Sequence, residues 1–218
     1  MTVMAESSLA QALPEAASIF RQTRTVTQVN GRYDSSNRLL DDLAGGVRAD
    51  VLITADAASM DRARAQGLVS GDVWTIATDR LVLAVPRGNP QRMAGLRSTV
   101  GRTLAACEDA APCGSAARTL AGTSGVRLAP SLTERTATDV RDRVAEGRVE
   151  AGITYHSVVR GARDRLDVVE IDGALASNRL QAAVLTSASS PGPAEDFVKF
   201  MVAPQGQGVL RLRGFDAP

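Results

Sequence analysis

Along the chain, short continuous apolar runs alternate with segments in which apolar residues recur every three or four positions. The runs predict strands and the spaced segments predict helices. Val3-Met4-Ala5 reads as a short apolar strand, and the apolar residues that follow return every three or four positions. That spacing is typical of a helix with one buried face. The helical positions are Leu9, Leu13, Ala16 and Phe20. The start of the chain therefore predicts a strand, a turn and a helix.

The same strand-and-helix unit returns further along the chain. Val51–Ala55 predicts a buried strand, and a helix is expected from about Ala57 to near Gly67, where a glycine suits the helix end. Further strands are predicted at Leu81–Val85, Thr103–Ala106, Gly152–Tyr155, Val168–Ile171 and Leu180–Leu185, and further helices at Ser115–Ala121, Ala194–Val202 and Gln205–Leu212. This alternation predicts an α/β fold with mostly parallel sheets flanked by helices.

Two serine pairs stand where the chain is expected to enter a helix. These are Ser7-Ser8 and Ser35-Ser36. A helix start leaves backbone N–H groups without partners and carries the positive end of the peptide dipole, so a serine there adds a donor to an anion site. The alternative is that both pairs are ordinary helix N-caps, for which serine is a preferred residue. In parallel sheets ligands gather at the carboxyl ends of strands, where Ser8, Ser36, the Cys113 turn and Tyr155 are expected.

Charge and composition narrow the class of partner. The chain has 218 residues, of which 44% are hydrophobic, and its 25 basic and 24 acidic residues give a formal net charge of +1. Its length is enough for one large domain or two small ones. The basic residues are scattered and form no stripe, so nucleic acid and membrane surfaces are poor partners. No apolar run approaches the roughly 20 residues that span a bilayer.

The two cysteines lie six positions apart, at Cys107 and Cys113. This spacing fits a small loop closed by a disulfide in an oxidising compartment. Two free thiols are the alternative, and the spacing alone does not decide between them.

Signatures of enzymes are missing. The chain contains no G-x-S-x-G elbow, no phosphate-binding Walker loop and no complete G-x-G-x-x-G. A hydrolase would have to combine the one histidine, His156, with Ser8 or Ser36 and an acid such as Glu6 or Asp34. A lone histidine after a strand is more often structural. One histidine and two close cysteines complete no common zinc site. We therefore expect no catalytic residues.

Taken together, these segments carry a family resemblance over essentially the whole chain. The most specific segment is Ala49-Asp50-Val51-Leu52-Ile53-Thr54-Ala55-Asp56, followed by Met60-Asp61 and Gly67-Leu68. Later matching segments are Asp79–Pro86, Ala111–Gly114, Thr138–Arg141, Ala151–Tyr155 and Gly214-Phe215. With the two serine pairs, this order of segments resembles the molybdate-binding proteins of bacterial ABC importers.

The resemblance implies a two-lobed, type II periplasmic solute-binding fold with a ligand cleft between the lobes. Lobe I would comprise residues 1–80 and 182–218, and lobe II residues 81–181. The resemblance further implies a monomer that binds molybdate or tungstate and delivers it to an ABC permease in the membrane. It implies no catalysis, no cofactor and no nucleic-acid partner. The protein would be located in the periplasm or outside the cell. The full-length precursor could in addition carry a lipid anchor.

The resemblance also implies a set of ligand residues. The serine ligands fall on Ser8 and Ser36, with Ser35 beside them. Backbone donors fall on Cys113 and Val140, and a hydroxyl donor falls on Tyr155. All six would contact oxygen atoms of the metal oxyanion. Neutral donors suit a dianion that has no proton to give, because they avoid the desolvation of a buried lysine or arginine.

The chain departs from the family pattern at one of these positions and at two positions close to them. Glu6 stands where the family has alanine, Asp34 stands where a small residue is common, and Cys113 replaces the usual alanine. A carboxylate beside the site would repel a dianion. We expect both acids to turn outward. The alternative is that the same fold binds another ligand, such as sulfate, phosphonate or chromate.

Overall fold

The computed structural model describes residues 1–23, 28–171 and 177–218 of the chain. These residues form two compact units, which we treat separately. Unit 1 contains residues 1–78 and 179–218, and unit 2 contains residues 79–178. The chain passes between the units within two strands, β4 (Val69–Pro86) and β9 (Ser177–Leu185). Residues 172–176 of the expected lobe II lie outside the described residues.

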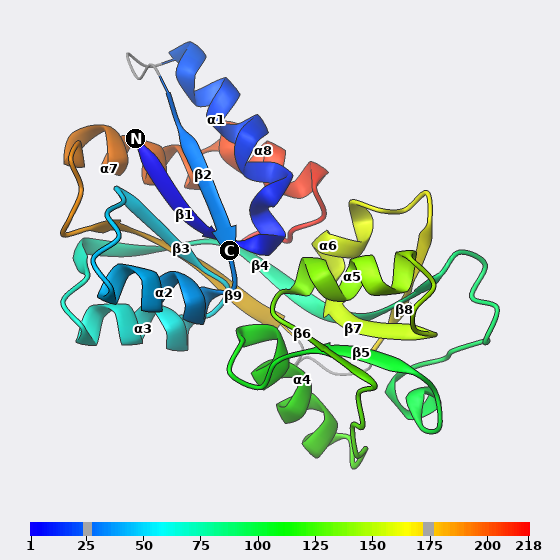
Figure 1. Ribbon diagram of the computed structural model, residues 1–218. Helices are drawn as coiled ribbons and strands as arrows, with labels where there is room; N and C mark the ends of the chain where they lie inside the picture. The colour runs from blue at the N-terminus through cyan, green and yellow to red at the C-terminus, as the bar shows by residue number, and fades with distance from the viewer. Residues whose placement is uncertain (24–27, 172–176) are drawn as a thin grey trace. The chain divides into compact units, whose positions relative to one another are not determined.

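Unit 1 is built on a sheet in which β1 (Thr2–Glu6) has a parallel neighbour on each side. The neighbours are β2 (Asn30–Asp34) and β3 (Val51–Thr54). β9 lies beside β3 and runs antiparallel to it. The order is therefore β2-β1-β3-β9, as Figure 1 shows.

Helices cover both faces of this sheet, because successive side chains of a strand point to opposite sides. Val3 and Ala5 of β1 pack into one hydrophobic cluster, and Met4 packs into another. The first cluster contains residues of α1 (Ala12–Thr23), α7 (Pro191–Val202) and α8 (Pro204–Leu212). The second contains residues of α2 (Ser36–Ala44) and α3 (Ala57–Ala65), on the opposite face in Figure 1.

The helix predicted after the first strand is confirmed, with a short 3-10 turn before it. This turn is η1 (Ser7–Ala10), and it leads into α1. The four positions predicted to face the core, Leu9, Leu13, Ala16 and Phe20, are each at most 1% exposed. Phe20 packs edge-on against Phe197 of α7, with ring centroids 5.1 Å apart.

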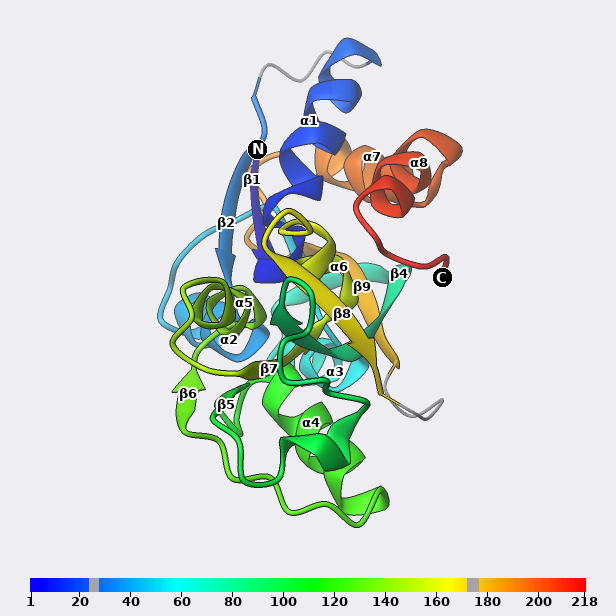
Figure 2. The same ribbon diagram turned by 90° about the vertical axis from the view of Figure 1, so that its right-hand side faces the viewer.

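Unit 2 has a second sheet, in the order β4-β7-β5-β6, with β8 on the other side of β4. Its strands are β5 (Leu104–Cys107), β6 (Leu132–Glu134), β7 (Ala151–Tyr155) and β8 (Leu166–Glu170). Its helices are η2 (Leu96–Thr99), α4 (Pro112–Thr123), α5 (Ala137–Ala145) and α6 (His156–Arg160). In both views α5 and α4 lie on opposite faces of this sheet (Figure 2).

A glycine allows α5 to approach the sheet closely. A Cβ atom on Gly152 of β7 would lie 2.7 Å from Val140 Cγ1 and 2.8 Å from Val144 Cγ2. Both valines are buried, so any larger residue at position 152 would push α5 away from β7.

The α/β fold is confirmed, and the strand directions refine it. Parallel pairs surround β1 and β5, whereas β4 runs antiparallel to β7 and β8. The apolar pattern did not reveal β2, β6, α5, α6 or the first half of β4. β2 is polar and largely exposed, so it lacks the apolar period that identifies a strand. None of the described helices has both the length and the apolar character needed to span a membrane.

Candidate functional site

The two serine pairs lie at the carboxyl edge of the unit 1 sheet. β1 and β2 are parallel, and their register places Glu6 opposite Asp34, the last residue of each strand. Ser7-Ser8 and Ser35-Ser36 directly follow these two residues. The two serine pairs therefore begin at neighbouring positions, as the strand-turn-helix pattern predicts.

Ser8 and Ser35 are nearly buried, yet their hydroxyl groups have no hydrogen-bond partner among the described residues. The exposed fractions are 9% for Ser8 and 2% for Ser35. Ser35 is the N-cap residue of α2, but its side chain makes no capping hydrogen bond. Ser8 lies inside η1, and the residue before that turn, Glu6, makes no capping bond either. The alternative that both pairs are ordinary N-caps is therefore wrong.

Ser36 is fully buried and takes part in two hydrogen bonds. Its Oγ accepts a hydrogen bond from the Ala55 backbone N–H, at 2.9 Å. The same oxygen donates to Glu6 Oε2, at 3.2 Å. Ser7 Oγ donates to the other carboxylate oxygen, Glu6 Oε1, at 3.0 Å. The carboxyl group of Glu6 thus bridges the two serine pairs.

The expectation that Glu6 turns outward is wrong. Glu6 is 1% exposed. It stands two positions after Met4, so its side chain leaves β1 on the face that α2 covers. Asp34 is half-buried, and its Oδ1 accepts a hydrogen bond from the Ser35 backbone N–H at 2.8 Å. Glu6 is therefore buried, and Asp34 is half-buried and hydrogen-bonded to the backbone.

Burial raises the pKa of Glu6 from its ordinary value of 4.5 to about 7. Removing a carboxylate from water disfavours its charged form, and this is the largest cause of the shift. Hydrogen bonds from Ser7 and Ser36 act in the opposite direction, while the negative charge of Asp56 adds to the rise. Near neutral pH, Glu6 is therefore poised between its charged and neutral forms.

Unit 2 contains a comparable buried carboxyl, Asp79, which is 1% exposed. Its Oδ2 accepts a hydrogen bond from Ser157 Oγ, and its Oδ1 accepts from the backbone N–H of Arg80 at 2.8 Å. Burial again is the main cause that raises its pKa, to about 7. Asp79 thereby fixes the first turn of α6 to β4.

Cys113 lies in the first turn of α4, and its backbone N–H has no hydrogen-bond partner in the described part of the chain. Pro112 begins the helix, and the N-cap residue Ala111 offers no side-chain cap. A disulfide to Cys107 ties this turn to the end of β5, with the two Cα atoms 5.7 Å apart. The next residue must be glycine, because a Cβ on Gly114 would lie 2.0 Å from the Glu108 carbonyl oxygen.

Replacing both cysteines with serine is expected to lower the free energy of unfolding by roughly 2 kcal/mol, because the open loop gains entropy in the unfolded chain. Anion affinity should change little, since Cys113 offers its backbone N–H and not its sulfur. Urea unfolding of the double variant and of the wild type, each with and without a thiol reductant, measures the first effect. Equal stability of the two proteins in the absence of reductant would contradict it.

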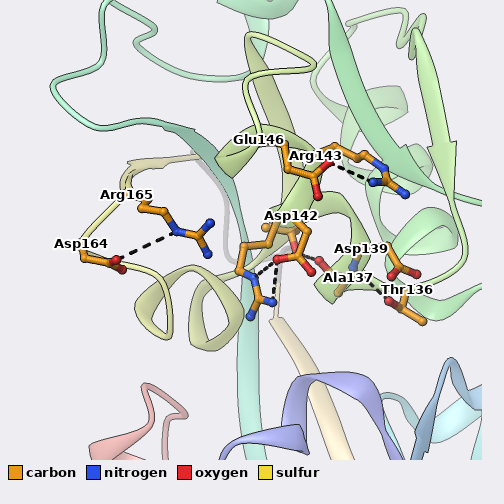
Figure 3. A network of polar contacts seen from close by, with 10 residues as sticks. Thr136, Ala137, Asp139, Asp142, Arg143, Glu146, Asp164 and Arg165 are labelled. Carbon is orange, nitrogen blue, oxygen red and sulfur yellow. Dashed lines mark hydrogen bonds and ion pairs between the residues drawn. The ribbon is translucent and has the colours of Figure 1, made fainter.

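The assignment of Val140 as a backbone donor does not fit the structure. Its N–H donates to the Thr136 carbonyl at 3.2 Å, inside α5. The N-cap residue Thr136 accepts from the Asp139 N–H at 3.0 Å, which satisfies a second group of the first turn (Figure 3). Ala137 is the first helical residue and is fully buried, and its N–H has no partner among the residues described. Ala137 is therefore the better backbone donor.

The hydroxyl of Tyr155 stands at the carboxyl end of β7. Tyr155 is 1% exposed, and its hydroxyl oxygen accepts a hydrogen bond from the Asn178 side-chain amide. β7 is parallel to β5, so Tyr155 ends its strand at the same edge of the sheet at which β5 leads into the Cys113 turn. Asn178 orients the phenol and was not predicted from the sequence.

Sequence reasoning missed Ala137 although a local signal was present. Thr136 and Asp139 have the spacing of an N-terminal capping box, which places the helix start at Ala137. No comparable signal exists for Asn178, because its contact with Tyr155 joins residues far apart in the sequence.

Comparison with known proteins gives a consistent result. Residues 1–216 match the family described as bacterial extracellular solute-binding protein. The molybdate-binding protein ModA of Mycobacterium tuberculosis is 30% identical over 221 residues, covering 100% of this chain and 85% of that protein. The structure of the periplasmic molybdate-binding protein of Azotobacter vinelandii has a TM-score of 0.82 at 19% identity, covering 100% of this chain and 99% of the other.

A neighbour named for a different anion has nearly the same fold. The sulfate-binding protein SubI of Mycobacterium tuberculosis has a TM-score of 0.81 at 20% identity, covering 100% of this chain and 86% of the other. The structural likeness therefore establishes the two-unit α/β fold and does not select an anion. The family match over nearly the whole chain, together with the full-length relative, shows that the chain belongs to the bacterial extracellular solute-binding proteins.

Proposed function

We propose that this protein captures molybdate or tungstate outside the cytoplasm and delivers it to an ABC permease. One observation carries the proposal: polar donors without protein partners stand at strand ends and helix starts of both units. They are the hydroxyls of Ser8 and Ser35 and the backbone N–H groups of Cys113 and Ala137, within the described residues. Donors that no protein acceptor occupies are available to a ligand. A bound anion would supply the missing acceptors.

The proposed contacts follow from these donors and from the family. Ser8, Ser35 and Ser36 of unit 1 would bind oxygen atoms of the oxyanion, as would Cys113 and Tyr155 of unit 2. Ala137 replaces Val140 in this set, for the reason given above. Each contact is a hydrogen bond to oxygen, so no side chain bonds the metal atom. The oxyanion is cargo and not a cofactor.

Neutral donors suit this cargo. Each hydrogen bond to a charged acceptor contributes roughly 1.5–3 kcal/mol, so several of them offset the desolvation of a dianion. The first turns of α2, α4 and α5 add the partial positive charge of helix N-termini. Sulfate has the same charge and shape but is smaller, so donors spaced for molybdate would hold it with stretched bonds.

The relatives favour molybdate over the alternative anions. The relative that is 30% identical over the full chain is named for molybdate, whereas the sulfate-binding neighbour shares only the fold. Membership of a solute-binding family also argues against a serine hydrolase built on Ser8 and His156. The protein is therefore assigned as a binding protein and not an enzyme.

The family implies a periplasmic or extracellular location and a permease partner. Beyond this, we propose that the protein acts as a monomer and that residues 1–80 with 182–218 and residues 81–181 act as its two lobes. Light scattering with and without molybdate tests the first statement. A lipid anchor on the precursor remains a separate proposal, tested by labelling the exported protein with a radioactive fatty acid.

Thermal unfolding in the presence of single anions tests the proposed function. Molybdate and tungstate are expected to raise Tm, because a ligand at a hundred times its Kd adds about 2.7 kcal/mol of stability. Sulfate and phosphate at the same concentration should leave Tm unchanged, and sodium chloride at matched ionic strength is the control. A shift with sulfate alone would assign the protein to sulfate, and no shift with any of these anions would refute the proposal.

A further inference from the structure

The hydrogen bonds of Ser36 conflict with its proposed role as long as Glu6 is charged. A hydroxyl has one proton to donate and two lone pairs that can accept. The proton of Ser36 points to Glu6 Oε2, and one lone pair accepts the Ala55 N–H. An anion also needs a donor. With Glu6 ionised, the Ser36 hydroxyl therefore has no proton left for the oxyanion. This inference rests on the proposed function, in which that oxyanion is the ligand.

The charge around Glu6 adds to this conflict. From β2, Asp34 stands opposite Glu6 in the strand register, and from the start of α3, Asp56 raises the pKa of Glu6 through its negative charge. α2 presents Ser36 to the carboxyl, while Arg38 of that helix is exposed. β3 has no ionisable residue. In the described part of unit 1, Glu6 has no ion pair, so a dianion nearby would meet an uncompensated carboxylate.

We propose that the protein takes up its oxyanion together with one proton, which is held on the carboxyl group of Glu6. Glu6 Oε2 is protonated from solvent and donates to Ser36 Oγ, so this hydrogen bond reverses its direction. Glu6 Oε1 remains the acceptor for Ser7. Ser36 then accepts from both Ala55 and Glu6, and its own proton turns to the oxyanion. No covalent bond other than this O–H bond is made or broken.

The reversed arrangement removes the conflict at Ser36. Ser36 Oγ uses two lone pairs and one proton, and the neutral carboxyl donates to Ser36 Oγ and still accepts from Ser7 Oγ and from the Ser36 backbone N–H. It also removes the negative charge from a residue that is 1% exposed. Because the pKa of Glu6 is about 7, Glu6 can gain this proton at ordinary pH.

Calorimetric titration with sodium molybdate at two pH values tests the inference. The wild type is expected to bind about tenfold more weakly at about pH 8 than at about pH 6, because the free protein must first gain the proton. At about pH 8, titrations in two buffers with different ionisation enthalpies should show uptake of about one proton per anion. This measurement needs no variant.

Glu6→Gln and Asp79→Asn form a matched pair of variants. The glutamine amide can donate to Ser36 while its oxygen accepts from Ser7, so Glu6→Gln imitates the protonated carboxyl. It should bind molybdate with the low-pH affinity of the wild type at both pH values and without proton uptake. Asp79→Asn removes the buried carboxyl of unit 2, which contacts Ser157, and should keep the wild-type pH dependence.

The outcomes separate this inference from the proposed function. Molybdate binding with the same affinity at both pH values and no proton uptake would overturn the role of Glu6 and leave the proposed function intact. A pH dependence that persists in Glu6→Gln, or is lost in Asp79→Asn, would also overturn it. No molybdate binding by either the wild type or Glu6→Gln at any pH would refute the proposed function itself.

Discussion

Ser8→Ala is expected to weaken molybdate binding by at least about tenfold, or about 1.4 kcal/mol, without changing the stability of the unliganded protein. The Ser8 hydroxyl has no hydrogen-bond partner in the described residues, so its removal leaves no protein group unpaired. Only the bond to the charged ligand is lost. Calorimetric titration measures the affinity, and urea unfolding without ligand measures the stability, which should stay within about 0.5 kcal/mol of the wild type.

Ser36→Ala provides the contrast. It should also weaken binding, but in addition it should destabilise the unliganded protein by about 1–3 kcal/mol, because the buried Ala55 N–H loses its acceptor. Ser70→Ala is the control, since Ser70 is an exposed serine of β4 in the same unit. It should change neither property. An unchanged affinity of Ser8→Ala would remove Ser8 from the site, whatever its stability.

The unliganded protein should lose stability as the pH rises from about 5 to about 8. Burial raises the pKa of both Glu6 and Asp79 to about 7, from ordinary values of 4.5 and 3.8. Across that window the folded state holds protons that the unfolded chain has already released, so the free energy of unfolding falls with pH. Each shift corresponds to a loss on the order of 3 kcal/mol.

Other carboxyls do not reverse this trend. Hydrogen bonds lower the pKa of Asp50, and hydrogen bonds and neighbouring arginines lower those of Glu150 and Glu170. Burial opposes these shifts, and at Asp50 it is the largest single influence although the net shift is downward. The stability that these three groups contribute is present above the ordinary pKa of a carboxyl and is lost only in more acidic solution.

Urea unfolding at about pH 5.5 and about pH 8 measures the difference. Glu6→Gln and Asp79→Asn should each remove about half of it, and the double variant should be nearly independent of pH in this range. Stability that stays constant or increases towards pH 8 in the wild type would show that these two carboxyls are ionised in the folded protein at low cost.

The serine pairs were located from the sequence because their positions follow from local patterns. The period of Val3-Met4-Ala5 and of the helix after it depends only on residues close in the chain, so the turn between them was predictable. The same holds for the helix that Asp56 caps, in which Asp56 accepts from the Ser59 N–H at 2.8 Å. Such a bond spans three residues and leaves a recognisable signature.

The orientation of Glu6 was not predictable in this way. The strand period indicates that Glu6 shares a face with Met4, but that face could have met solvent. It is covered because α2 packs there, and Ser36 Oγ reaches Glu6 across 30 positions of sequence. The error at Val140 has a different cause, since the helix start at Ala137 followed from a local signal that was overlooked.

The sequence by itself determined the buried apolar strands and most of the longer helices, the two serine turns that follow strand ends, and the family to which the chain belongs. These properties depend on short-range periodicity and on the residues at each turn. The tertiary structure decided which donors keep their protons for a ligand and that Glu6 and Asp79 are buried. Hydrogen bonding and desolvation depend on neighbours in space, and in this protein those neighbours come from segments far apart in the chain.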